Sequence, residues 1–360
     1  MEFPLINKNT KKLDKIHIDL DPVFSYNLPF MFVISEREAG KSTKAWLKIW
    51  RDFYFKGKST LVIRRHVIDV TETYIEDSLE ILDKFCPNFD REKINYKRAD
   101  LKIGILNVYY GDELFFRVVG LSKQLSSLKS LVMRNIGLMV FDEFICNLRG
   151  GEKYLKQESF KFKELYNTFQ RECDGTLRVL FLGNPYSLYN PYFSDLKVDT
   201  SKIKAGAFVK GANYVIWCYQ ITDELKETIL KRNPLYKFDD AYTRYAFNGE
   251  AINDANIKIS SKPQNYRLEF AFRIDSHFLG VYRNMDYLDN NQYYIEEIQD
   301  ISNRKKIYCF DFSDLLERTA YVTGEDSFRF RRLKRAFGNR QVLFNNLTCY
   351  YLMEDVYNGL

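Results

Sequence analysis

The chain has 360 residues, 46% of them hydrophobic, so its length and composition exclude a disordered protein and predict one large domain or two ordinary ones. Its 54 basic and 48 acidic residues give a formal charge of +6, which permits a polyanionic partner but does not by itself identify a nucleic-acid-binding protein. The six cysteines lack C-x-x-C spacing and no apolar run reaches the roughly 20 residues of a membrane helix, so we expect a soluble intracellular protein without a zinc site, a disulfide framework or a membrane partner.

Buried strands and helices alternate up to about residue 220. Apolar runs predict strands at residues 30–35, 59–65, 136–144 and 176–184, helical spacing predicts helices at 42–57, 70–85 and 160–173, and residues 102–120 have the pattern of a hairpin that turns at Gly111 and Asp112. Continuous apolar strands between helices predict a mainly parallel sheet that is covered on both faces. We therefore assign residues 1–221 to an α/β domain.

The rest of the chain has a different pattern. Residues 222–258 are polar with helical stretches, which predicts a short helical linker. Aromatic-rich, alternating runs then return and predict a mostly antiparallel sheet, followed by a helical end that begins with a strongly basic run. We assign residues 259–360 to a second, α+β domain.

A candidate phosphate loop lies in FMFVISEREAGKST, residues 30–43, where Gly40, Lys41 and Ser42 stand between a buried strand and a helix. In this setting backbone N–H groups and the helix dipole point at a phosphate, Lys41 supplies charge to the outer phosphates, and Ser42 supplies a hydroxyl to Mg²⁺. Ser35 stands where the usual pattern has its first glycine, and the tripeptide alone can also arise by chance. The residues expected to contact the nucleotide are Ser35, Glu36, Arg37, Glu38, Ala39, Gly40, Lys41, Ser42 and Thr43.

Three further polar side chains follow strands of the same predicted sheet. Asp142 and Glu143 end the run GLMVFDEF, and Asn184 ends LFLGN. Asp142 would hold the water shell of the metal ion, Glu143 would polarise the attacking water, and Asn184 would sense the γ-phosphate or hold that water. The alternatives are that the acid pair begins a solvated loop and that Asn184 caps a turn. In this order on one sheet, the motifs predict an ATPase that uses ATP and Mg²⁺.

Arg171, at the end of the helix predicted at 160–173, has two interpretations. As an arginine finger it would enter a neighbouring subunit's site and offset transition-state charge. An arginine on a helix more often belongs to a solvated face or a surface ion pair. The spacing alone favours the second interpretation.

Five segments together resemble the DNA-packaging ATPase, or encapsidation protein, of the small tailed phages with protein-primed linear genomes, a compact relative of the terminase large subunits. They are FVISEREAGKS, STLVIRRH, VFDEF, LGNPYSLYNPYF and FRRLKRAFGNRQVLFNN, and they occur in order over most of the chain. The resemblance implies an ASCE-type P-loop ATPase that forms a homopentameric ring on the portal of a prohead and drives double-stranded DNA inward. It also implies a protein of the host cytoplasm that is at the portal vertex transiently and not in the mature virion. Whether a packaging RNA takes part stays open.

The same resemblance implies roles for single residues. Four residues match the part of the family's ATP site that comes from the same subunit. Lys41 and Ser42 match the lysine and serine of the phosphate loop, Asp142 matches the magnesium-coordinating acid, and Glu143 matches the catalytic glutamate. Lys129 matches a family lysine that reaches the neighbour's ATP. Arg171 matches the arginine finger only loosely, because the residues CDGT are extra after its helix. Ser35 and Glu38 replace two family glycines, so we expect an altered nucleotide affinity.

The C-terminal domain of this family resembles a ribonuclease H fold that has lost its nuclease carboxylates. Here Asp275 ends a predicted strand, but we find no two further strand-end acids of the kind that a two-metal nuclease needs, so we predict no nuclease activity. We interpret the domain as a nucleic-acid-binding and docking module. Its candidate basic patch, for which the alternative is the solvated face of a helix, consists of Arg329, Arg331, Arg332, Lys334 and Arg335.

Two other functions stay open from the sequence. Another ring-forming translocase or helicase of the same fold would prefer single strands stacked on aromatic side chains. A catalytically inactive nucleic-acid-binding protein would carry Ser35 and Glu38 as marks of a decayed loop. Strand displacement on a forked substrate would favour the first, and absent ATP binding would favour the second.

Overall fold

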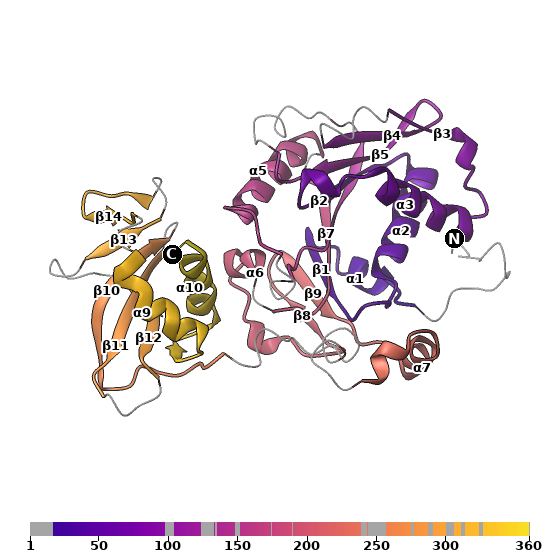
Figure 1. Cartoon of the computed structure of the whole chain (residues 1–360). Helices are drawn as coiled ribbons and strands as arrows, with labels where there is room; N and C mark the ends of the chain where they lie inside the picture. The colour runs from indigo at the N-terminus through magenta and orange to yellow at the C-terminus, as the bar shows by residue number, and fades with distance from the viewer. Residues whose placement is uncertain are drawn as a thin grey trace. The chain divides into compact units, whose positions relative to one another are not determined.

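The computed structural model describes residues 17–97, 104–123, 133, 135–147, 152–173, 175–188, 190–238, 243, 257–274, 277–286, 291–299, 306–310, 314–323 and 327–359 (Figure 1). The chain divides into two compact units, the N-terminal unit Met1–Ile252 and the C-terminal unit Asn253–Leu360. Most of the segment 222–258 thus belongs to the N-terminal unit. Within the described ranges no helix is long and apolar enough to cross a membrane.

One large sheet organises the N-terminal unit. Its described residues form nine strands in the order β3 (Ile94–Tyr96), β4 (Ile105–Tyr110), β5 (Glu113–Gly120), β2 (Ser59–Arg64), β6 (Ile136–Asp142), β7 (Arg178–Gly183), β1 (Phe30–Ile34), β9 (Tyr214–Cys218) and β8 (Phe208–Lys210). The strands from β5 to β9 run parallel to one another, whereas β3, β4 and β8 are antiparallel to their neighbours at the edges. The predicted mainly parallel α/β fold is confirmed.

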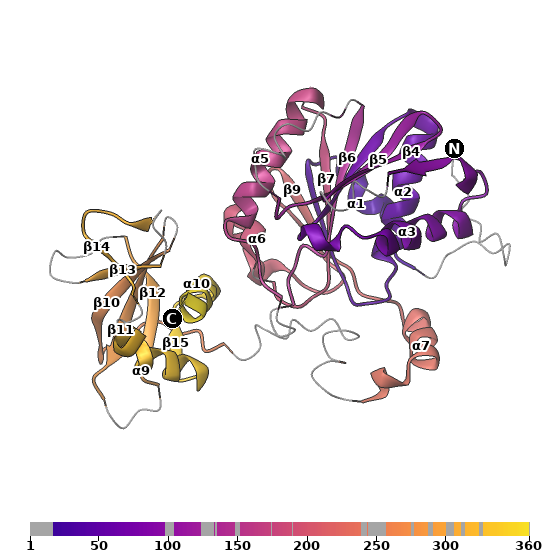
Figure 2. The ribbon, with the colours of Figure 1, turned by 45° about the horizontal axis from the view of Figure 1, so that its top comes forward.

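Helices cover both faces of this sheet. Alternate residues of β1 enter two different apolar clusters, Phe32 and Ile34 on one face and Met31 and Val33 on the other. The α-helices among the described residues of the N-terminal unit are α1 (Asp21–Ser25), α2 (Lys41–Lys56), α3 (Glu72–Phe85), α5 (Glu158–Gln170), α6 (Pro191–Asp195) and α7 (Asp223–Arg232). Figure 2 shows α2 and α3 on one side of the strands and α5 and α6 on the other. Because both faces are apolar, polar side chains gather at the strand ends.

The hairpin predicted at residues 102–120 is confirmed. Strands β4 and β5 pair antiparallel, and Gly111 between them has φ 61°, a left-handed conformation that glycine adopts without steric cost. Sequence patterns did not predict the strands β3, β8 and β9. Of these, β9 is the parallel neighbour of β1 and brings the chain back beside the candidate phosphate loop.

The C-terminal unit has a mixed sheet. In its described part the strand order is β14 (Thr319–Tyr321), β13 (Ile307–Cys309), β10 (Tyr266–Ile274), β11 (His277–Asn284), β12 (Tyr293–Glu297) and β15 (Val342–Phe344). Strands β10, β11 and β12 are antiparallel as predicted, but β13, β14 and β15 join in parallel. The prediction of a mostly antiparallel sheet is therefore wrong for these three strands, because alternation reports a half-buried strand and carries no information on its direction.

The end of the chain is not entirely helical. Helices α9 (Ser327–Gly338) and α10 (Leu347–Gly359) form as predicted, but β15 lies between them and extends the sheet beside β12. Side chains of both helices, among them Phe330 and Met353, pack with Phe272 in the apolar cluster of this unit. The three apolar residues of β15 were too short a run to predict a strand by periodicity.

The core between α2 and the sheet depends on Trp50, which is fully buried and whose ring lies 5.1 Å from Phe89 and Tyr110 and 5.5 Å from Phe115 between centroids. We expect Trp50→Ala to lower the free energy of unfolding by about 3 to 5 kcal/mol, because it removes an aromatic side chain from a closed core. Urea denaturation measures this change. The control Ile68→Ala removes a side chain that is 81% exposed and should change the free energy by less than about 0.5 kcal/mol.

Candidate functional site

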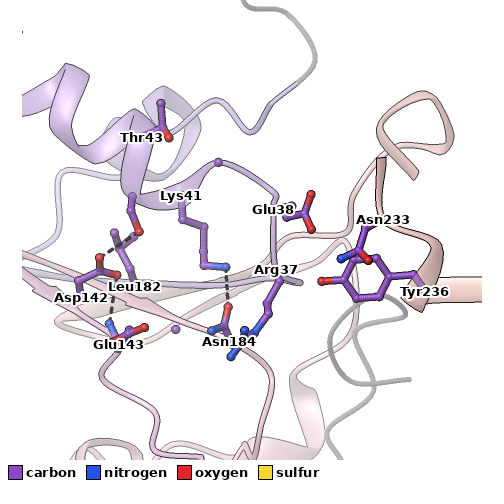
Figure 3. Close-up of a pocket in the computed structure, with 13 residues that line it drawn as sticks. Arg37, Glu38, Lys41, Thr43, Asp142, Glu143, Leu182, Asn184, Asn233 and Tyr236 are labelled. Atoms are coloured by element: carbon purple, nitrogen blue, oxygen red, sulfur yellow. Dashed lines mark hydrogen bonds between the residues drawn. The ribbon is translucent and has the colours of Figure 1, made fainter. Parts of the chain in front are cut away.

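The candidate site is a cavity of about 540 Å³ at the carboxyl ends of β1, β6 and β7. Six of the nine expected loop residues line it, namely Arg37, Glu38, Gly40, Lys41, Ser42 and Thr43. Asp142, Glu143 and Asn184 line it from the neighbouring strand ends, so the parallel sheet brings the predicted motifs together. Figure 3 shows Lys41 pointing toward Asn184, with Asp142 and Glu143 nearby.

The loop turns into α2 at Gly40. This residue has φ 87°, and a Cβ built on it would lie 2.8 Å from the Cβ of His17, so both conformation and space require glycine. The N–H of Lys44 donates to the Gly40 carbonyl at 2.9 Å and begins the helix. The free N–H groups of the first turn of this 16-residue helix and the positive end of its dipole are therefore at the cavity, an arrangement suited to an anion.

Lys41 is buried among oxygen atoms. Its ammonium donates to the carbonyls of Ser35 and Glu36 at 2.9 Å, to the Ser35 hydroxyl at 3.0 Å and to the Asn184 amide oxygen at 3.1 Å. Burial lowers the pKa of Lys41 to about 8, although the carboxylates of Asp142 and Glu36 act in the opposite direction. The hydroxyl of Ser35 thus has a structural part in the loop, since it accepts a hydrogen bond from Lys41.

Ser42 and Asp142 form the oxygen pair expected for a metal site. The Ser42 hydroxyl donates to Asp142 Oδ2 at 2.9 Å across the cavity wall. Burial raises the pKa of Asp142, and the nearby charge of Glu143 raises it further. A hydroxyl and one carboxylate fit Mg²⁺, because this ion is usually bound by one or two carboxylates together with water and phosphate oxygens.

Glu143 follows the end of β6 in an unusual conformation. Its φ is 60°, a left-handed value that costs a non-glycine residue roughly 1 to 2 kcal/mol. Its carboxylate is 59% exposed and accepts a hydrogen bond from Arg64 Nη2, at the end of β2, at 2.9 Å. Strained backbone of this kind persists where the surrounding structure holds it, and it is concentrated at functional sites.

Three of the expected loop residues lie behind the cavity wall. Ser35, Glu36 and Ala39 are all buried. The Glu36 carboxylate accepts from the N–H of Ile221 at 3.4 Å, and burial raises its pKa. These three residues shape the loop from behind, whereas the lining residues face the space where a ligand would lie.

The sequence profile of the podovirus DNA encapsidation protein (Gp16) family matches residues 14–359 of the chain. The chain is a member of this family. Among solved structures, the bacteriophage phi29 viral genome packaging motor assembly is 19% identical with a TM-score of 0.64, and the match covers 96% of this chain and 99% of that one. The Phi-28 gp11 DNA packaging motor is 17% identical with a TM-score of 0.64 and coverage of 94% and 97%. A search of curated proteins found no match. The expected family is thus confirmed, and the two structures show that its fold is shared.

Arg171, to which the family resemblance gave a role at a neighbouring subunit's site, does not line the cavity of its own chain. Arg171 is exposed at the end of α5, beside Cys173, whose thiol lies 3.4 Å from the carbonyl of Ile136 at the start of β6. Since Asp142 lies six residues further along β6, Arg171 is at the opposite edge of the sheet, about 20 Å away. Lys129 lies outside the described residues, as does Asp275.

Residues from the segment predicted as a linker also line the site of this encapsidation protein. Asn233 and Tyr236, the second of them in the 3-10 helix η7 (Pro234–Lys237), face Arg37 and Glu38 (Figure 3). A second cavity of about 260 Å³ shares Glu38, Gly40 and Thr43 with the first and is closed by His17 and by Thr228, Ile229 and Arg232 of α7. The apolar pair Leu225 and Ile229, four residues apart, is the sequence signal that α7 packs against the domain.

Two loop positions with a left-handed backbone give opposite expectations. Glu38 has φ 61°, a value that is unfavourable for a residue with a Cβ, so Glu38→Gly should raise the free energy of unfolding by about 1 kcal/mol. Gly40→Ala should lower it by about 2 kcal/mol or more, because its Cβ would meet His17 in addition to the backbone strain.

Urea denaturation of each variant checks both values. The matched control is Gly57→Ala, at φ 59° with nothing within 4 Å of the added Cβ, which isolates the backbone cost of about 1 kcal/mol. If Gly40→Ala costs no more than Gly57→Ala, the contact with His17 does not constrain the loop.

Proposed function

We propose that this encapsidation protein hydrolyses ATP with Mg²⁺ and uses the reaction to translocate double-stranded DNA into a prohead. The main support is that a lysine and a hydroxyl from one segment meet an acid pair from another, about 100 residues further on, at one edge of a parallel sheet and around a helix N-terminus. These residues are Lys41, Ser42, Asp142 and Glu143. Charged and hydroxyl groups in this arrangement are those that phosphoryl transfer requires.

The two adjoining cavities suit the two parts of ATP. The phosphates would lie in the larger cavity, against the N-terminus of α2 and Lys41. The nucleoside would extend past Thr43 into the cavity of about 260 Å³, which is smaller than the roughly 300 Å³ of a complete small-molecule site. There Ile229 offers an apolar surface and Arg232 a guanidinium that can stack on a base.

Each side chain has a distinct part in hydrolysis. Ser42 and Asp142 would hold Mg²⁺, which when bound neutralises charge on the outer phosphates. Lys41 would exchange its present oxygen partners for phosphate oxygens, and its bond to Asn184 supports a position of that amide beside the terminal phosphate. Glu143 would accept a hydrogen bond from the attacking water and orient it in line with the bond that breaks.

A ring of subunits would complete the site. Arg171 lies too far from its own cavity to touch the phosphates, so its proposed role as an arginine finger requires a neighbouring copy. Lys129 is assigned to the same shared site. We propose a homo-oligomeric ring, a pentamer, that sits transiently at the portal vertex in the host cytoplasm and holds duplex DNA through phosphate contacts. A packaging RNA is a further candidate partner.

The C-terminal unit is proposed as a ribonuclease H-like module without nuclease activity that binds nucleic acid or docks on the portal. Arg331, Arg332 and Arg335 are exposed on α9, which supports a role as a basic patch. Lys334 instead lies over the ring of Tyr357 at 5.3 Å, so part of its surface is used in packing. Arg329 belongs to α9, and its side chain lies outside the described residues.

The ATPase function is tested with the wild-type protein and Glu143→Gln, each with and without duplex DNA. We expect hydrolysis that duplex DNA stimulates, and a fall of about a hundredfold or more in Glu143→Gln with ATP binding retained, because the amide cannot accept the proton of the attacking water. Phosphate release and fluorescent nucleotide binding measure the two quantities. Wild-type protein that binds no ATP, even with duplex DNA and proheads present, would contradict the proposed function.

The lowered pKa of Lys41 predicts a pH dependence of nucleotide affinity. Above about pH 8 the free protein loses the Lys41 proton, whereas bound phosphates favour the charged form and raise its pKa, so binding then takes up a proton. Affinity for ADP without Mg²⁺ should therefore fall about tenfold from about pH 7 to about pH 9. Calorimetry measures it, and Lys41→Arg, which stays charged, should show a flat profile. If the ADP affinity of the wild type and of Lys41→Arg falls equally with pH, a group other than Lys41 causes the change.

A further inference from the structure

Two consecutive arginines at the end of β2 contact the same residue from different directions. Arg64 is the last residue of β2 and Arg65 follows it. The Arg64 guanidinium lies over the ring of Tyr74 and that of Arg65 over the ring of Phe141, and these rings belong to the apolar clusters on opposite faces of the sheet. Arg64 binds the carboxylate of Glu143. Arg65 binds its backbone, with Nη1 donating to the Glu143 carbonyl at 2.9 Å and Nη2 to the Phe144 carbonyl at 2.8 Å.

The guanidinium of Arg65 is held in place by a buried carboxylate. Arg65 is 6% exposed, and its Nε and Nη2 donate to the two oxygens of Glu158 at 2.9 and 3.2 Å. Glu158, the first residue of α5 and 2% exposed, also accepts from the N–H of Leu155 at 2.8 Å and from the hydroxyl of Tyr192 at 2.9 Å. The buried charges are therefore paired and hydrogen-bonded on both sides, as an interior ion pair must be.

The contacts of Arg65 matter for function because they lie on the turn that carries Glu143. Glu143 has a left-handed backbone, which is unfavourable unless neighbouring groups hold it. One side of the turn is fixed by the N–H of Phe144, which donates to the Leu182 carbonyl of β7 at 3.1 Å. Arg65 fixes the other side through both carbonyls. A guanidinium can serve two carbonyls and a carboxylate at once because its donors are arranged in a rigid plane, whereas an ammonium is a single point.

We propose that Arg65 is a positioning residue for the reaction at Glu143: braced by Glu158 and Tyr192, it fixes the left-handed turn from which the Glu143 carboxylate faces the attacking water. This inference rests on the proposed ATPase function. It assigns no contact with ATP to Arg65, which is separated from the cavity by the turn that it holds. Loss of its two carbonyl contacts would let the carboxylate move without altering the phosphate loop.

The test is Arg65→Lys in the full-length protein, because lysine keeps the charge beside Glu158 but cannot bridge both carbonyls. We expect kcat for ATP hydrolysis to fall about tenfold to a hundredfold, since a small misplacement of a catalytic group has an effect of this size. The Kd for ATP should stay within about twofold, because the phosphate loop is unchanged.

A second variant, Tyr192→Phe, removes one hydrogen bond to Glu158 and keeps the ring. It should lower kcat by less than Arg65→Lys does, and it should also leave the Kd for ATP unchanged. The matched control is Arg91→Lys, in a surface pair with Glu76, which should leave both quantities unchanged.

A double variant separates positioning from a general loss of structure. If Arg65 acts through Glu143, adding Arg65→Lys to Glu143→Gln should cause no further fall in kcat. A further fall of the same size as in the wild-type background would overturn the proposal, as would an unchanged kcat in Arg65→Lys or a parallel loss of kcat and ATP binding. Should Arg65→Lys not fold, Tyr192→Phe decides by the same criteria. An inactive wild type would instead count against the ATPase function itself.

Discussion

The site depends on the burial of one positive charge, the ammonium of Lys41, at the edge of a sheet that is apolar on both faces. The buried ammonium takes its hydrogen-bond partners from the surrounding chain, and these are carbonyl and hydroxyl oxygens of the loop and the amide oxygen of Asn184. These bonds join β1, the loop and β7 around one atom. The Lys41 ammonium therefore fixes the positions of the loop, of helix α2 and of the end of β7 relative to one another. A phosphate in the cavity would bind this same ammonium.

Much of this arrangement could be predicted from the sequence because it is local. The loop lies between a continuous apolar strand and an amphipathic helix, and Asp142 and Asn184 each end an apolar strand, so the parallel sheet had to bring them to one edge. The contacts of Arg65 could not be predicted in this way. Its carboxylate partner is 93 positions away, and no periodicity links the end of a strand to the first residue of a distant helix.

The other differences between the sequence-based predictions and the structure also arise from contacts between residues that are distant in the sequence. Residues 222–258 have a polar composition typical of a linker, yet Leu225 and Ile229 of α7 are only 2% exposed and bring Asn233 and Tyr236 to the cavity. In the C-terminal unit, alternation predicted the half-buried strands correctly but not their directions, which depend on the path of the connections between them. Short elements such as β9 and β15 are fixed by neighbours that are distant in the sequence.

Helix α5 connects the turn at Glu143 with the exposed position of Arg171. Its first residue, Glu158, is bonded to the arginine that holds the turn at Glu143, and Arg171 follows its last residue, about 20 Å away. A hydrogen-bonded helix of this length behaves as a stiff strut, so its two ends cannot shift independently. A displacement of the end next to Arg171 would therefore tilt the helix at Glu158 as well, so α5 would couple the exposed end mechanically to the turn that carries Glu143.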